Sequence, residues 1–164
     1  MKAYIGIDNG VSGSIAFING STAAMAPTPV RTELSYTVAK ANITRVDVVE
    51  LETRLYMWSK LASGVLVILE RPYVNPKGFK ATLSAIRALE AMLICIERVG
   101  LPYMYVDSRK WQRVMLPSKL SGAELKSASR DVGVRLFPGL RDEIMDHKDA
   151  DSLLMAEWGR REAL

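Results

Sequence analysis

The chain has 164 residues, of which 49% are apolar and 24% charged, and this composition is ordinary for a globular protein and fits one domain over residues 1–164. It shows no signal peptide, no apolar run of the roughly 18 residues that cross a membrane and, with Cys95 as its only cysteine, no internal disulfide, so we expect a cytoplasmic protein. The net charge of +4 permits a polyanionic partner without requiring one.

Three antiparallel strands are expected near the start of the chain. A tight turn around Asn9-Gly10 separates the first two strands, because this dipeptide is typical of short hairpin turns. Prolines then interrupt regular structure, and we expect a loop with one added strand there. The segments are strands at 4–7, 14–18 and 22–25 and the loop at 27–44.

From residue 47 onward, expected helices alternate with buried strands. Residues 47–61 place apolar side chains three and four positions apart, which is typical of an amphipathic helix. Residues 65–69 are a continuous apolar run, which favours a strand buried on both faces. The other elements are a loop at 73–80, a helix at 81–99, a strand at 103–106, helices at 108–116 and 121–132 with Ser108 and Ser121 as N-caps, and a last helix from 148 or 149. This order predicts a mixed α/β layer architecture.

Three acidic residues lie where buried elements begin or end. Asp8 follows the first strand, Glu70 follows the apolar run at 65–69, and Asp151 lies near the start of the last helix. Buried carboxylates are costly unless a positive charge compensates them, and Mg²⁺ prefers oxygen ligands. Two such ions about 4 Å apart activate water and stabilise the leaving oxygen in phosphoryl chemistry. We therefore predict a metal site with these three residues as ligands.

Each of these acids also has a purely structural interpretation. Asp8 can be an ordinary turn aspartate, and Glu70 can pair with a neighbouring Arg or Lys. Asp149 or Asp151 can be a first-turn acid that favours the helix dipole, and His147 can be a capping or surface histidine. The metal site is favoured only because all of these residues occur together in a particular order.

Four segments, taken together, resemble the RuvC-type Holliday junction resolvases. They cover nearly the whole chain, and their order along it is more specific than the first segment alone. The segments are IGIDNGVSGSIA at 5–16, VILERP at 67–72, GLPYMYV and SRKW within 100–111, and HKDADSLLMAEW at 147–158.

The resemblance implies a ribonuclease-H-like fold, an α/β protein with a mixed five-stranded sheet flanked by helices. It implies a phage-type crossover junction endodeoxyribonuclease of DNA recombination and repair, in a bacterial cytoplasm or a phage-infected cell. Such an enzyme is a homodimer that nicks opposing strands of a four-way junction with two Mg²⁺ or Mn²⁺ ions, leaving 5′-phosphate and 3′-hydroxyl ends. Asp8, Glu70 and Asp151 match its metal ligands.

The sequence does not decide which residue is the fourth metal ligand. Members of the family place a second Asp or a His three to five residues before the last Asp, and here those positions hold Lys148, His147 and Asp146. If the last helix includes residue 147, His147 shares a face with Asp151. If the helix begins at Asp149, the preceding loop can aim His147, Asp146 or Asp149 at the site. Asp149 and His147 rank nearly equal as catalytic residues, Asp146 ranks just below, and Lys148 is available to a phosphate.

The middle of the chain is strongly basic and predicts contacts with DNA. Residues 77–130 hold ten Lys and Arg residues and four acids. Basic side chains neutralise phosphates, and an aromatic side chain can stack on an unpaired base. Phe79 or Tyr73 is the expected wedge at a junction centre, unless Phe79 packs as a minor core residue. The expected DNA contacts are Tyr73, Lys77, Phe79, Lys80, Arg109, Lys110 and Arg113.

The helix start at 109–113 and the long helix at 81–99 have alternative interpretations. The Arg and Lys side chains at 109–113 can form a solvated helix turn, and Trp111 is expected in the core. The helix at 81–99 carries Ala85, Ala88 and Ala91, which suits a dimer surface but also a one-sided core helix.

Other functions also remain open. The protein can be a nuclease for RNA–DNA hybrids, forks or flaps, or a DNA-structure-binding protein without catalysis. Residues 5–10 also resemble the phosphate loop of the actin and sugar-kinase ATPases, although those proteins need two such domains.

Overall fold

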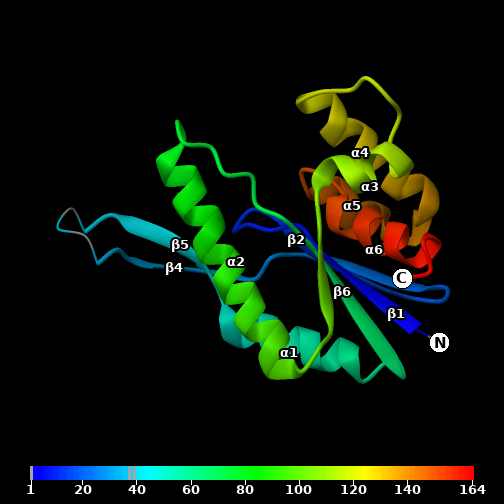
Figure 1. Ribbon diagram of the computed structural model, residues 1–164, viewed down its shortest axis with the longest axis horizontal. Coiled ribbons are helices and arrows are strands. Elements are labelled where there is room, and N and C mark those ends of the chain that lie inside the picture. The colour runs from blue at the N-terminus through cyan, green and yellow to red at the C-terminus, as the bar shows by residue number, and fades with distance from the viewer. Residues whose placement is uncertain (1, 37, 39) are drawn as a thin grey trace.

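A computed structural model describes residues 2–36, 38 and 40–164 of the chain, and its centre is a mixed five-stranded sheet (Figure 1). The spatial order of the strands is β3-β2-β1-β6-β7. The first three strands form an antiparallel meander, whereas β6 and β7 run parallel to β1. Their bounds are β1 Lys2–Ile7, β2 Ser14–Asn19, β3 Thr22–Pro27, β6 Gly64–Glu70 and β7 Tyr103–Val106. The predicted five-stranded mixed sheet is confirmed.

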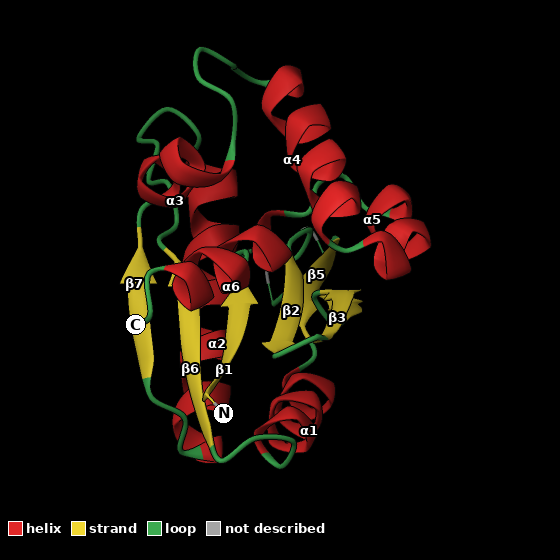
Figure 2. Ribbon diagram, turned by 90° about the vertical axis from the view of Figure 1, so that its right-hand side faces the viewer, coloured by secondary structure: helices red, strands yellow, loops and turns green. Residues whose placement is uncertain are grey.

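Helices cover both faces of the sheet, so the central strands are buried on both sides (Figure 2). Successive residues of a strand point to opposite faces. On β6, Val67 and Leu69 join the hydrophobic cluster under α1 (Val48–Ser59) and α2 (Phe79–Val99), whereas Ile68 joins the cluster under α6 (Asp151–Arg161). The remaining α-helices lie on the α6 side and are α3 Ser108–Met115, α4 Ala123–Leu136 and α5 Arg141–Asp146.

A two-stranded hairpin replaces the loop that was expected at 27–44. Strands β4 (Val30–Leu34) and β5 (Asn42–Val46) pair antiparallel and extend beside α2, away from the main sheet (Figure 1). Glu33 forms ion pairs with Arg31 and Arg45, which are opposite each other across the hairpin. The prediction had one added strand and missed the second, because both strands are mostly polar and exposed and show no clear apolar alternation. Residues 37 and 39 lie outside the described residues.

Several helix ends differ from the predictions. Ser108 is the first residue of α3 rather than its N-cap, which is Asp107. Gly122, not Ser121, is the N-cap of α4, although the Ser121 N–H does donate to the Glu124 carboxylate at 3.3 Å. Helix α4 also continues beyond residue 132, and the 3₁₀ turn at Pro138–Leu140 and helix α5 after it were not predicted.

Long-range packing explains the longer helical region. Leu136, Phe137 and Leu140 pack against the cluster under α6, and Ile144 of α5 is fully buried in it. Pro138 and Gly139, residues that favour a break in regular structure, therefore interrupt the helices for only one short 3₁₀ turn. Within the described residues, no helix is both long and apolar enough to cross a membrane.

Candidate active site

The C-terminal ends of β1 and β6 bring the first two predicted acids to one edge of the sheet. The strands are parallel neighbours in which Ile7 lies opposite Leu69. Asp8 directly follows β1, and Glu70 is the last residue of β6. Both carboxyl groups therefore lie at the same sheet edge, as the strand-end positions in the sequence predicted.

Helix α6 brings Asp151 to this edge because Gly6 allows the helix to lie close against β1. A methyl group at Gly6 would overlap the backbone carbonyl of Ser152, the second residue of α6. The Ser152 hydroxyl lies 2.7 Å from that of Ser14, at the start of β2. The first turn of α6 is thus fixed beside the end of β1.

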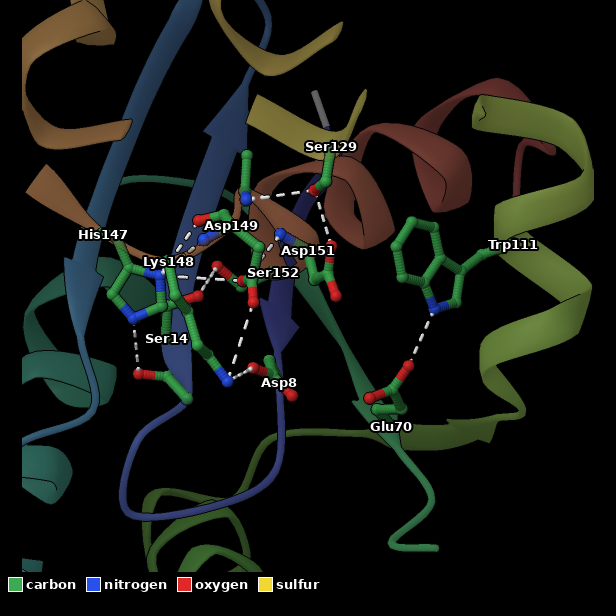
Figure 3. Close-up of polar contacts among 12 residues, drawn as sticks. Asp8, Ser14, Glu70, Trp111, Ser129, His147, Lys148, Asp149, Asp151 and Ser152 are labelled. Carbon is green, nitrogen blue, oxygen red and sulfur yellow. Dashed lines mark hydrogen bonds and ion pairs between the residues drawn. The ribbon is translucent and has the colours of Figure 1, made fainter. Parts of the chain in front are cut away.

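Figure 3 shows the carboxyl groups of Asp8, Glu70 and Asp151 turned toward one space between β1, β6 and α6. Burial raises the pKa of Glu70 to about 8, and repulsion from Asp8 and Asp151 contributes to the increase. Burial likewise raises the pKa of Asp151 to about 7, with repulsion from Asp149 and Asp8. The pKa of Asp8 is also raised by burial, although Lys148 opposes the change. The three acids form a cluster with too little positive charge nearby.

Two neutral donors orient these carboxyl groups. The indole N–H of Trp111 donates to Glu70 Oε1 at 3.0 Å, and the Ser129 hydroxyl donates to Asp151 Oδ1 at 2.5 Å. Trp111 is fully buried, so its predicted core position is confirmed, but sequence reasoning missed its bond to Glu70. It also missed Ser129, because no local signal on α4 points to an acid 22 residues away.

The segment before α6 is a loop, because the helix begins at Asp151 rather than at 148 or 149. Asp149 is only 2% exposed, and its Oδ2 lies 3.6 Å from Lys148 Nζ. Burial alone would raise the pKa of Asp149, but His147 and Lys148 hold it below its ordinary value. Asp149 therefore lies next to the three-acid cluster as a buried, charge-compensated carboxylate.

Both ring nitrogens of His147 face backbone oxygens. Nδ1 lies 2.9 Å from the Asp149 carbonyl oxygen, and Nε2 lies 3.2 Å from that of Gly13. The hydrogen bond to Asp149 raises the pKa of His147, and the Asp149 backbone N–H also lies 3.4 Å from Nδ1, so both ring nitrogens already have backbone partners. A metal ligand needs a free nitrogen lone pair, so this arrangement fits a link between the β1–β2 turn and the loop before α6. Asp146 is exposed at the end of α5.

The three central acids fit a divalent cation by their chemistry. Carboxylate oxygens are the ligands that Mg²⁺ and Mn²⁺ prefer, and a cation would remove the repulsion that burial strengthens here. Within the described residues, no three Asp, Glu, His or Cys side chains are as close together as the ligands of a bound ion. Asp8, Glu70 and Asp151 would therefore have to move closer together when they bind one.

A cleft of about 390 Å³ extends from Glu70 along the loop that follows it. Tyr73 and Ser108, the first residue of α3, both line this cleft. Tyr73 is 83% exposed and Phe79 is 72% exposed, so the interpretation of Phe79 as a minor core residue is wrong. Arg71 pairs with Asp107 at 3.6 Å, and Glu70 instead bonds to Trp111.

The basic residues predicted to bind DNA are exposed on the loop, α2 and α3, the elements that contribute residues to this cleft. Lys77 and Lys80 lie in the loop after β6 and the first turn of α2, and Arg109 and Arg113 lie on α3. The Lys110 ammonium lies 5.4 Å from the centre of the Trp158 ring. The exposed positions leave all five cations accessible to a polyanion.

Part of the alanine-rich face of α2 packs into the chain's own core, so it is not wholly available as a dimer surface. Ala88 is 2% exposed and belongs to the cluster that α2 forms with α1 and the sheet. Leu83, Ile86 and Ile94 of the same helix remain 36% to 45% exposed.

Solved structures, among them the two described here, resemble this chain over nearly its whole length. No family model and no curated protein matches its sequence. T. thermophilus RuvC in complex with a Holliday junction substrate matches with a TM-score of 0.57 and 14% identity, over 98% of this chain and 94% of that one. The Fowlpox virus resolvase in complex with Holliday junction DNA matches with a TM-score of 0.52 and 12% identity, over 99% of each chain.

The chain has a RuvC-like ribonuclease H fold. The fold class expected from the four sequence segments is thereby confirmed. At these identities the likeness shows the fold alone, so the function has to be argued from the side chains at the edge of the sheet.

Proposed function

We propose that this chain is a divalent-cation-dependent endonuclease, a single domain over residues 1–164, that nicks four-way DNA junctions. The observation that carries the proposal is the placement of Asp8, Glu70 and Asp151, from three separate elements, around one space at the sheet edge. The substrate class is supported by the likeness to two proteins whose structures contain Holliday junction DNA.

Asp8, Glu70 and Asp151 would hold the divalent cation. Bound there, the cation would activate a water for attack on phosphorus and stabilise the leaving 3′ oxygen. A new P–O bond to the water oxygen forms and the P–O3′ bond breaks, which leaves 5′-phosphate and 3′-hydroxyl ends. Trp111 and Ser129 each bind one carboxylate oxygen, of Glu70 and Asp151, and thereby keep the second oxygen of each acid directed toward the cation.

The DNA would follow the cleft beside Glu70. Lys77 and Lys80 on one side and the basic residues of α3 on the other would bind phosphates near the three acids. Tyr73 and Phe79 are exposed at this cleft and at the start of α2, where either ring could stack on a base at the junction centre. Affinity for branched DNA would thus come from residues separate from the metal ligands.

A homodimer would supply the second active site that paired nicks require. The exposed apolar residues of α2, Leu83, Ile86 and Ile94, are the surface that we assign to the second copy. Its burial in a dimer would leave the edge that carries Asp8 and Glu70 open to DNA.

The direct test is a nicking assay on an immobile four-way junction, with linear duplex, flap and RNA–DNA hybrid as parallel substrates. We expect Mg²⁺-dependent paired nicks in the junction, much slower cleavage of the other substrates, and no cleavage in EDTA. Equal cleavage of all four substrates would refute the junction preference. Tight junction binding without any cleavage would instead identify a non-catalytic DNA-structure-binding protein.

A further inference from the structure

We propose that the Lys148 ammonium group occupies the position of a second cation, so that the site takes one divalent ion per chain rather than two. This inference rests on the proposed nuclease function and changes the expected number of ions. It concerns the residue that stands where the related sequences are expected to place an acid or a histidine.

The Lys148 ammonium group contacts two carboxylates at once, as a metal ion that bridges them would. Its Nζ atom lies 3.4 Å from Asp8 Oδ2 and 3.6 Å from Asp149 Oδ2, and Figure 3 shows it between the two acids. Asp8 and Asp149 come from different parts of the fold, the end of β1 and the loop before α6. One ammonium group thus joins an acid of the three-acid cluster to the acid beside it.

Both oxygens of Asp149 already have partners that an ion would have to compete with. Its Oδ2 faces Lys148, and its Oδ1 accepts from the Asp151 backbone N–H at 3.4 Å and lies 3.6 Å from His147 Nδ1. The residue is also almost completely buried. A divalent ion placed between Asp8 and Asp149 would have to displace the ammonium group or lie against it, and two like charges at that distance repel strongly.

Asp8, Glu70 and Asp151 remain for a single ion. Their carboxyl groups face one space, on the side of Asp8 away from Asp149 (Figure 3). The Lys148 side chain is 36% exposed, so its ammonium group can reach solvent and a phosphate oxygen. An ammonium is a compact point charge that binds phosphate well, so Lys148 would neutralise the reacting phosphate in the position where a second ion would otherwise do so.

The stoichiometry of Mn²⁺ binding tests this inference without any cleavage reaction. Calorimetric titration of the wild-type protein with Mn²⁺, together with electron paramagnetic resonance of the free ion, should give one ion per chain. Two ions per wild-type chain would overturn the role of Lys148 and leave the nuclease proposal intact. Failure to bind any Mn²⁺ would overturn the metal site itself, and the inference with it.

A substitution separates the effect of Lys148 from the intrinsic capacity of the site. Lys148→Ala should raise the number of Mn²⁺ ions bound from one to two per chain, because the freed carboxylates of Asp8 and Asp149 can then accept an ion. Lys60→Ala, at an exposed lysine at the end of α1, should still bind one ion. A folded Lys148→Ala variant that binds only one ion would contradict the proposal, with circular dichroism as the check on folding.

Discussion

Asp8→Asn will lower the rate of junction nicking by about 10³-fold or more while junction binding changes little. The amide keeps the shape of the side chain but removes the negative charge that a divalent cation needs. DNA affinity should persist because the basic residues of the cleft and of α3 are unchanged. Single-turnover cleavage in Mg²⁺ and a band-shift titration in EDTA measure the two quantities separately.

Asp131→Asn is the matched control for this prediction, because Asp131 is an exposed aspartate on α4. It removes the same charge and should nick at the wild-type rate. Wild-type nicking by a folded Asp8→Asn variant would refute the assignment of Asp8 as a metal ligand. Parallel loss of binding and cleavage would show that Asp8 acts through the fold instead.

The metal-free protein will lose stability as the pH rises from about 5 to 8. The pKa of Glu70 is about 8 and that of Asp151 about 7 in the folded chain, against ordinary values of 4.5 and 3.8. Between these values the folded state holds protons that the unfolded state has released, so the free energy of unfolding falls with rising pH. The extra stability is fully present below the ordinary values and is lost above the folded ones.

The expected size of this effect is large for a chain of this length. One pKa unit corresponds to about 1.4 kcal/mol, so the combined shifts predict a loss of several kcal/mol. Thermal unfolding in EDTA should therefore show a melting temperature at least about 5 °C lower at pH 8.5 than at pH 5.5. Mg²⁺ or Mn²⁺ should restore much of the loss at the higher pH, because a bound cation compensates the ionised carboxylates.

Glu70→Gln should weaken this pH dependence, since the amide does not titrate. Glu162→Gln, an exposed position at the end of α6, should retain the wild-type dependence. Metal-free wild-type protein whose melting temperature rises through this pH range would contradict the buried-acid cluster.

Sequence patterns within a single strand were enough to predict the positions of two of the three acids. The apolar run before Glu70 and the strand before Asp8 placed both acids at strand ends, and parallel pairing of β1 with β6 then brings them together. The hairpin β4–β5 was missed because its strands are mostly polar and exposed. Helix α5 was missed because it depends on the contacts of Ile144 with the core cluster under α6. These contacts join residues far apart in the sequence.

The side-chain contacts around Asp151 could not be predicted because they depend on the residue at which α6 begins. With α6 starting at Asp151, His147 lies in a loop and faces Gly13 of the first turn, and the helical spacing argument for it does not apply. Ser129 and Trp111 reach their acids across 22 and 41 residues of sequence. No periodicity or motif identifies such partners.

The position of a bound ion is the most direct test of the central claim that Asp8, Glu70 and Asp151 together form a divalent cation site. A crystal structure of the protein with Mn²⁺, with an anomalous difference map at the manganese edge, locates the ion without reference to activity. We expect a peak within coordination distance of all three carboxylates. A strong peak elsewhere on the chain, or three acids that stay apart in saturating Mn²⁺, would contradict the claim.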